Sequence, residues 1–234
     1  MNAVITFINQ YPFIFAFLFG LVPALIWLWF WLKEDTHPEP VKMVTLSFLG
    51  GILAVIFVLP FEQLVFNYVK AENLLSFTLW AALEELFKFL FVYFIALRNK
   101  KIVDEPIDDI IYLIISALGF ATAENALFLF GSLQNAGLMS AIVSGDLRFV
   151  GASVLHILAS ATIGVCMALA FYKSKNTKQV YLAIGLILAI ILHTLFNVFI
   201  INGVGGNIFL TFGAVWLGIV IIFLFIEKVK RMNA

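Results

Sequence analysis

The chain has 234 residues, of which 63% are hydrophobic and only 12% are charged, and its mean hydropathy is +1.08. Soluble globular domains contain about 25% charged residues, so this composition excludes a soluble domain and indicates a polytopic membrane protein. The formal net charge is zero, which by itself says nothing about partners. For a membrane protein of this kind we expect no nucleic-acid partner.

Seven segments are long and apolar enough to cross a membrane, because about 20 apolar residues span the hydrocarbon core. In chain order they are roughly 12–32, 43–60, 74–97, 109–130, 147–171, 179–201 and 207–226. We therefore predict an all-α fold, a bundle of about seven transmembrane helices. The prediction is a single integral domain over residues 1–234, multi-pass in the cell membrane and surrounded by the lipid bilayer. The lone cysteine, Cys166, lies inside a predicted span and gives no disulfide framework.

The basic residues indicate the orientation of these spans, because loops on the cytoplasmic side retain Lys and Arg. With the N-terminus outside, eleven basic residues fall in inner segments and one, Lys70, falls in an outer loop. Arg148 lies at an outer helix end and Lys88 lies within a span, which completes the 14 Lys and Arg. We therefore predict that the N-terminus is outside and the C-terminus inside.

Ionisable residues interrupt four of the predicted spans. Glu84 and Glu85 lie side by side in the segment 74–97, and Lys88 follows within about one helical turn. A charge at the centre of a bilayer costs at least about 2.5 kcal/mol on insertion scales, so such residues mark functional sites. At about 1.5 Å of rise per residue, four residues share a layer roughly 9–15 Å below the outer surface. These four are Glu84, Glu124, His156 and His193.

The helices around this layer suit a buried polar centre. Segments 109–130 and 147–171 are rich in Gly, Ala and Ser, which let helices approach closely. Asn197 follows His193 by four residues and so lies on the same helix face, one turn away. These polar residues could instead have a purely structural role. They would then be buried packing residues whose hydrogen bonds are satisfied, or a Glu–Lys pair whose charges neutralise each other. We favour a functional site, because five ionisable groups and an amide at one depth are costly to bury.

Four polar motifs follow one another along the chain: Glu84-Glu85-x-x-Lys88, Phe120-x-x-x-Glu124-Asn125, His156, and His193-x-x-x-Asn197. In this order they resemble the PrsW family of intramembrane proteases, which is related to the CAAX prenyl proteases and bacteriocin-processing enzymes. The segment Asp35-Thr-His-Pro-Glu-Pro40 also resembles an acidic, proline-bearing loop of that family. The likeness covers about residues 33–200. In the wider superfamily, Arg stands at the position of Lys88 and His at that of Glu124, and both departures match PrsW.

The resemblance implies an intramembrane peptidase that cleaves a membrane-anchored protein near the extracytoplasmic side of the membrane. The substrate that it suggests is an anti-sigma factor, cut in the first step (site-1 cleavage) of regulated proteolysis. It favours glutamate-type catalysis without a metal or other cofactor.

The roles of the site residues follow from the resemblance and from the needs of peptide hydrolysis. Glu84 is expected to polarise the water, with His156 or Glu124 beside it. His193 and Asn197 suit donation to the developing oxyanion. The other site residues are Glu85, whose role could be exchanged with that of Glu84, and the supporting Lys88 and Asn125.

Alternatives use the same residues. Two His and a Glu are a sufficient zinc ligand set, so a zinc-dependent metalloprotease stays open. Chains of Asp, Glu and His also form proton pathways, so a proton- or cation-coupled transporter is a second alternative. The lack of a detectable internal repeat and of broken-helix signals counts against the transporter. A third alternative is a non-catalytic receptor or chaperone that has kept the fold of the protease family.

Overall fold

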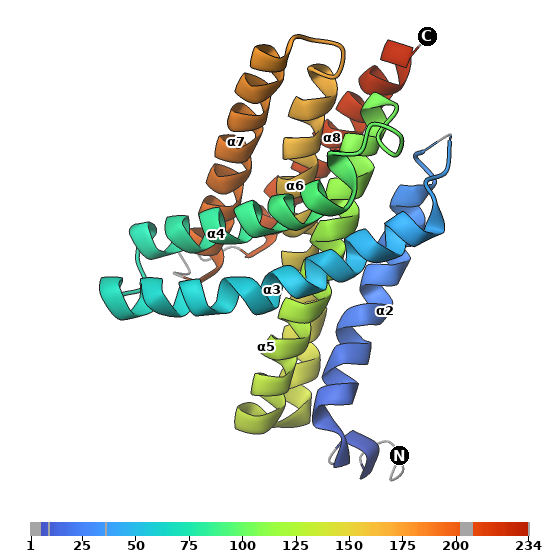
Figure 1. Ribbon diagram of the computed structural model, residues 1–234. Helices are drawn as coiled ribbons and strands as arrows, with labels where there is room; N and C mark the ends of the chain where they lie inside the picture. The colour runs from blue at the N-terminus through green and yellow to red at the C-terminus, as the bar shows by residue number, and fades with distance from the viewer. Residues whose placement is uncertain (1–5, 9, 36, 202–207, 234) are drawn as a thin grey trace.

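The described elements of the chain are helices. The structure is a computed structural model and describes residues 6–8, 10–35, 37–201 and 208–233. No strand occurs in these ranges, which confirms the predicted all-α fold. The elements (Figure 1) are α2 (Pro12–Leu32), α3 (Val41–Val69), α4 (Leu74–Val92), the π-helical turn η1 (Tyr93–Leu97), α5 (Pro106–Val150), α6 (Ala152–Leu169), α7 (Lys175–Ile201), α8 (Ile208–Lys230) and the 3₁₀ helix η2 (Arg231–Asn233).

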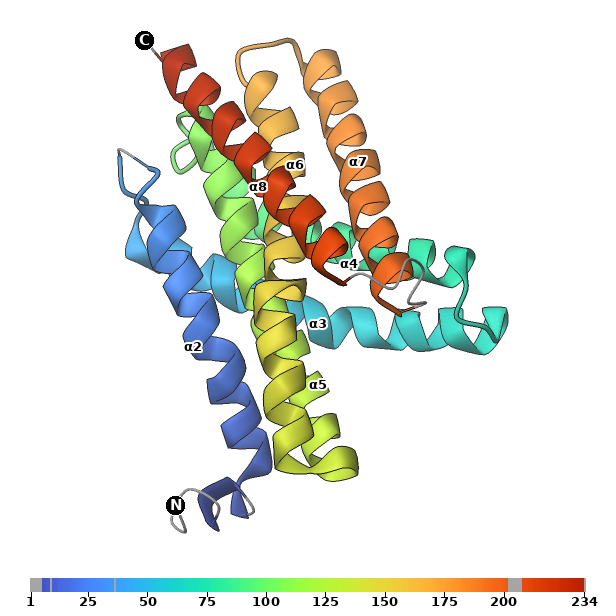
Figure 2. The same ribbon diagram turned by 180° about the vertical axis from the view of Figure 1, so that it is seen from behind.

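The helices run in two directions. Helices α2 and α5 to α8 run along the length of the molecule, whereas α3 and α4 lie side by side across them (Figures 1 and 2). The main hydrophobic core draws most of its residues from α5 and α6, which lie at the centre. Within α5 the chain reverses at Gly137, whose φ of 81° and ψ of 175° are easily adopted only by glycine. The segment between the predicted spans 109–130 and 147–171 is therefore helical on both sides of one glycine.

Glycines allow α3 to cross α5 at backbone contact distance. A Cβ atom on Gly51 would lie 2.0 Å from the carbonyl oxygen of Ser116, and one on Gly119 would lie 1.9 Å from that of Phe48. Any side chain at either position would push the helices apart, which is why small residues mark close helix crossings in membranes. This crossing fixes α3 on the central helix and, through the short connection 70–73, also places α4.

A capping box sets the beginning of α4. The side chain of Asn73 accepts hydrogen bonds from the backbone N–H groups of Leu75 and Ser76, and the Ser76 hydroxyl accepts one from the backbone of Asn73. Such reciprocal bonds satisfy backbone donors that the first helical turn leaves unpaired. With the helix start fixed, the three charged residues of α4 face the interior: Glu84 is 8% exposed, and Glu85 and Lys88 are 0% exposed.

Six of the described helices are long and apolar enough to cross a membrane: α2, α3, α5 as far as Met139, α6, α7 and α8. Many large apolar side chains on α2, α3, α7 and α8 are exposed, as only a lipid environment would permit at this extent. The protein is therefore an integral, multi-pass membrane protein. The predicted span 74–97 is helical, as α4 and η1, but its three charges keep it out of the six. The count of seven crossings and the orientation of the termini stay predictions.

Candidate active site

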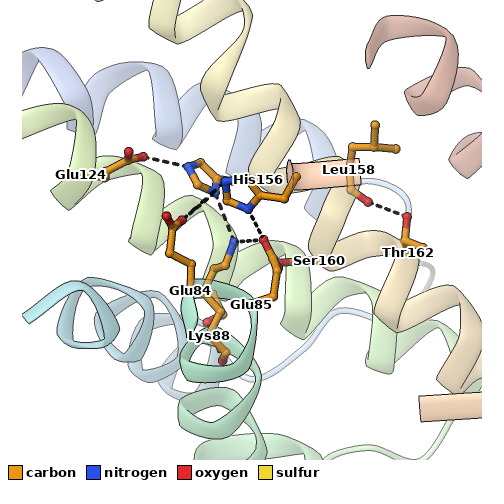
Figure 3. A network of polar contacts seen from close by, with 10 residues as sticks. Glu84, Glu85, Lys88, Glu124, His156, Leu158, Ser160 and Thr162 are labelled. Carbon is orange, nitrogen blue, oxygen red and sulfur yellow. Dashed lines mark hydrogen bonds and ion pairs between the residues drawn. The ribbon is translucent and has the colours of Figure 1, made fainter. Parts of the chain in front are cut away.

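Glu85 is the centre of a buried polar cluster (Figure 3). Its Oε1 lies 2.5 Å from Nζ of Lys88 and 2.8 Å from Nδ1 of His193, and its Oε2 accepts a 3.2 Å hydrogen bond from the hydroxyl of Ser160. Lys88 lies one turn further along α4, whereas Ser160 comes from α6 and His193 from α7. A buried ion pair is tolerated where further hydrogen bonds satisfy its atoms. Glu85 thus joins three helices through one fully satisfied carboxylate.

His156 of α6 has a contact at each ring nitrogen. Its Nε2 lies 2.8 Å from Oε2 of Glu124 on α5, and its Nδ1 lies 3.1 Å from Nζ of Lys88. An ammonium group can only donate, so Nδ1 accepts from Lys88 and the proton of the neutral ring is on Nε2, donated to Glu124. The ring also packs against Phe120, with centroids 5.3 Å apart. His156 therefore has no lone pair left for another partner.

His193 differs from His156 in having one free nitrogen. Because Glu85 accepts from Nδ1, the neutral ring has a lone pair at Nε2. That atom lies 3.7 Å from Oε2 of Glu84, and the two imidazole rings meet edge to face with centroids 5.1 Å apart. The lone pair of His193 is thus directed towards the carboxylate of Glu84.

Glu84 presents an unsatisfied acceptor to the same point. Its Oε2 is buried and has no hydrogen-bond partner in the part of the chain that the structure describes. Nδ1 of His156 lies 4.0 Å from this oxygen and Nε2 of His193 lies 3.7 Å from it. Facing acceptors require a proton, a donating water or a cation between them. The arrangement is suited to acid–base chemistry on a bound water.

Two carboxyl groups form the more open side of the cluster. The side chain of Glu124 is 34% exposed, against 10% for that of Glu84. Glu62 of α3 lies close enough to Glu84 and Glu124 for its charge to interact with theirs. Glu62 is not predicted as a site residue from the sequence, because it falls just beyond the predicted span 43–60, where an acidic residue is ordinary. Continuation of α3 to Val69 is what brings it to the site.

The structure brings together most of the residues predicted from the sequence, from four different helices, but it leaves two outside the network. Asn125 donates a 3.0 Å hydrogen bond to the hydroxyl of Ser153 and so links α5 to α6 beside the cluster. Asn197 is half-buried one turn from His193, and no hydrogen bond of its side chain is found among the described residues. The residues brought together are Glu84, Glu85, Lys88, Glu124, His156 and His193.

Three side chains of the cluster have the chemistry of metal ligands. Glu84, His156 and His193 each have a ligand atom within 4.8 Å of those of the other two. Both imidazoles contact a carboxylate through their other nitrogen, as metal-bound histidines usually do. Nζ of Lys88, however, lies against Nδ1 of His156, the nitrogen nearest Glu84. The three side chains fit a divalent cation if the ammonium group of Lys88 moves away from Nδ1 of His156. With Lys88 in place, the available ligand atoms are Oε2 of Glu84 and Nε2 of His193.

The fold and the cluster define the class of the protein: an integral membrane protein with a buried carboxylate–imidazole centre built from several helices. Comparison with known proteins identifies the family. A family model described as PrsW family intramembrane metalloprotease matches residues 39–226. The chain belongs to the PrsW family of intramembrane proteases, which confirms the resemblance seen in the motifs.

Curated relatives share this name and cover most of the chain. Protease PrsW of Clostridioides difficile (strain 630) is 30% identical over 190 residues, which is 77% of each chain. Protease PrsW of Geobacillus kaustophilus (strain HTA426) is 30% identical over 185 residues, or 76% of each chain. Protease PrsW of Bacillus subtilis (strain 168) is 31% identical over 178 residues, 74% of this chain and 77% of the relative. No solved structure matches the chain significantly.

Proposed function

We propose that this PrsW-family protein hydrolyses a peptide bond of a membrane-anchored protein with a water molecule activated by Glu84, without a metal ion. The main support is the pair of facing acceptors, Oε2 of Glu84 and Nε2 of His193, 3.7 Å apart. A water beside them can donate one hydrogen to each, which satisfies both acceptors and holds the oxygen in place. A water held beside a carboxylate is the nucleophile that peptide hydrolysis needs.

In this mechanism the water oxygen attacks the carbonyl carbon of the scissile peptide while one water proton passes to Glu84. Collapse of the tetrahedral intermediate breaks the C–N bond, and Glu84 gives the proton to the leaving amine. Neutral His193 has no donor at Nε2, because Glu85 holds the Nδ1 proton. We therefore assign to His193 the role of positioning the water. It could donate a hydrogen bond to the oxyanion only after its ring is protonated. Asn197, one turn along α7, is our proposed oxyanion donor.

The contacts divide the remaining residues by role. Glu85 fixes the tautomer and the position of His193, and Lys88 compensates its charge, so both act through other groups. His156 has both nitrogens occupied, by Lys88 and by Glu124, which favours a positioning role over that of the base. Glu84 is thus preferred to Glu85 as the base, since Glu85 already accepts three hydrogen bonds.

Membership of a family of membrane proteases implies a membrane-protein substrate. We propose a single-pass protein cut near the extracytoplasmic side, with an anti-sigma factor as the first candidate. This assignment is supported by the family resemblance and by the predicted outer position of the polar layer. It can be tested by comparing membrane-protein fragments from cells that carry the wild-type chain with those from cells that carry Glu84→Gln.

A zinc-dependent protease is the second candidate function. It is favoured by the three convergent ligand atoms of Glu84, His156 and His193 and by the carboxylate behind each histidine. The description of the matching family as a metalloprotease also favours it. A zinc ion bound there would lower the pKa of its water to about 7 and polarise the peptide carbonyl.

The deciding experiment follows cleavage of the identified substrate by the purified protein in liposomes. Glu84→Gln should lower kcat by about 10²–10⁴-fold, the usual contribution of a general base, and leave the protein folded. Glu72→Gln, an exposed Glu before α4, is the matched control and should leave kcat unchanged. Treatment with a strong chelator should also leave kcat unchanged. Loss on chelation with recovery on adding zinc would contradict the metal-free mechanism and favour the second candidate.

The same liposomes test the transporter alternative. Proton or cation flux that Glu84→Gln abolishes, without cleavage of any membrane protein, would contradict the peptidase proposal. Cleavage without such flux would support it.

A further inference from the structure

A second group of acidic side chains lies away from the active site, between the α2–α3 connection and the beginning of α5. These two segments lie near each other at one end of the molecule in both views (Figures 1 and 2). Asp35 and Glu39 come from the connection, and Asp108 comes from the first turn of α5. One carboxylate oxygen of each lies within 4.8 Å of those of the other two. Asp108 precedes Glu124 by 16 residues, so the two clusters are about 24 Å apart along α5.

Two of these carboxylates are buried with one oxygen unsatisfied. Asp35 is 6% exposed and Asp108 is 1% exposed. Oδ1 of Asp35 accepts a 2.9 Å hydrogen bond from the backbone of His37, but its Oδ2 has no partner among the described residues. Oδ2 of Asp108 accepts 2.9 Å bonds from the backbone of Asp104 and of Glu105, but its Oδ1 has no partner in the part of the chain that the structure describes. Helix capping therefore accounts for one oxygen of Asp108 and leaves the other free to bind.

Glu39 completes the group from a less buried position. Its Oε2 accepts a 2.6 Å hydrogen bond from the hydroxyl of Tyr112, one turn after Asp108 on α5. Within the described ranges, no Lys or Arg forms an ion pair with any of the three carboxylates. Burial raises the pKa of Glu39 to about 8, the Tyr112 hydrogen bond opposes this, and the charge of Asp108 adds to it. Burial also raises the pKa of Asp35.

We propose that Asp35, Glu39 and Asp108 bind a divalent cation that prefers oxygen ligands, Mg²⁺ or Ca²⁺. Carboxylate oxygens are the ligands that these hard cations take, whereas zinc sites are built mainly from His and Cys. The cation would satisfy the two orphaned oxygens and cancel the repulsion among three desolvated charges. It would also tie the α2–α3 connection to α5. The site shares no residue with the Glu84 cluster and does not depend on the peptidase proposal.

The test measures thermal unfolding of the full-length, detergent-solubilised protein after removal of divalent cations. Adding Mg²⁺ or Ca²⁺ at a tenfold excess over its dissociation constant should raise Tm by about 3–6 °C, and K⁺ at matched ionic strength should not. Asp35→Asn should abolish the shift, with Glu39→Gln as a second variant if the first does not fold. Asp104→Asn, which neutralises an exposed carboxylate in the loop just before α5, should keep the shift.

Two further readouts separate a cation site from a structural cluster. Without divalent cations, Asp35→Asn should raise Tm, because it removes repulsion, whereas loss of a structural carboxylate would lower it. Tb³⁺ emission excited through Tyr112 should be seen in the wild-type protein and lost in Asp35→Asn. Absence of any divalent-specific Tm shift would overturn the proposal and leave a proton-sharing cluster. An equal shift in wild type and Asp35→Asn would also overturn it, because the cation would then bind elsewhere.

Discussion

The buried pair of Glu85 and Lys88 allows the cluster's energetics to be tested in a double-mutant cycle. Both side chains are 0% exposed, so solvent does not screen their interaction. Removing one partner of such a pair costs about 3–5 kcal/mol, because the other charge stays buried and unpaired. Replacing both with neutral side chains of similar size costs far less. We therefore expect Glu85→Gln and Lys88→Met each to lower the free energy of unfolding by about 3–5 kcal/mol.

The double variant should recover most of this loss and lie within about 2 kcal/mol of the wild type, since no buried charge is then unpaired. Lys230→Met is the control: Lys230 is 24% exposed and pairs with Glu34 at 2.7 Å and with Glu227 at 3.0 Å, both partly exposed. Breaking these pairs should cost about 1 kcal/mol or less each. The free energies come from reversible unfolding in detergent, and cleavage is measured on the same samples. Additive losses in the double variant would refute the pairing.

Activity should not follow stability in this cycle. The double variant should stay inactive because His193 loses its charged hydrogen-bond partner, and recovered cleavage would refute the positioning role of Glu85.

Two further predictions concern the fold. Gly119→Ala should lower the free energy of unfolding by about 1–3 kcal/mol, because its Cβ would lie 1.9 Å from the carbonyl oxygen of Phe48, while Gly213→Ala, with nothing within 4 Å, should be neutral. Thermal unfolding of both variants checks this, and equal effects would contradict the close crossing. Reporter fusions after residues 101 and 175 should read cytoplasmic and one after 137 extracytoplasmic, and the reverse pattern would overturn the predicted orientation.

The existence of the helices was predictable, but their directions were not. Segment 12–32 was predicted with the bounds that α2 has, and 74–97 with the combined bounds of α4 and η1. Hydropathy depends on the length and apolar content of a segment, and these are the same whether a helix runs parallel to its neighbours or across them. The crosswise direction of α3 and α4 depends on which backbones meet, and the contact of Gly51 with Ser116 is invisible in a single sequence.

The membership of the polar cluster was predictable for a different reason. Ionisable residues are so costly in an apolar span that their presence marks a site without any structure. The division of labour was not predictable, because it depends on which nitrogen of each histidine meets which carboxylate. His156 was a candidate base from the sequence, and the structure places Lys88 on its Nδ1. The oxyanion role of Asn197 stays a prediction.

Neighbouring glutamates of identical chemistry differ here because a helix directs adjacent side chains about 100° apart. Either Glu84 or Glu85 could reach Lys88, at i+4 or i+3, so spacing alone does not choose between them. The choice is made by other helices: α6 supplies Ser160 and α7 supplies His193, and both donate to Glu85. Those bonds use the acceptor capacity of Glu85, whereas a buried oxygen of Glu84 has no hydrogen-bond partner within the described ranges. The unsatisfied carboxylate is the one that gains most from accepting a proton, and for that reason we assign the base to Glu84.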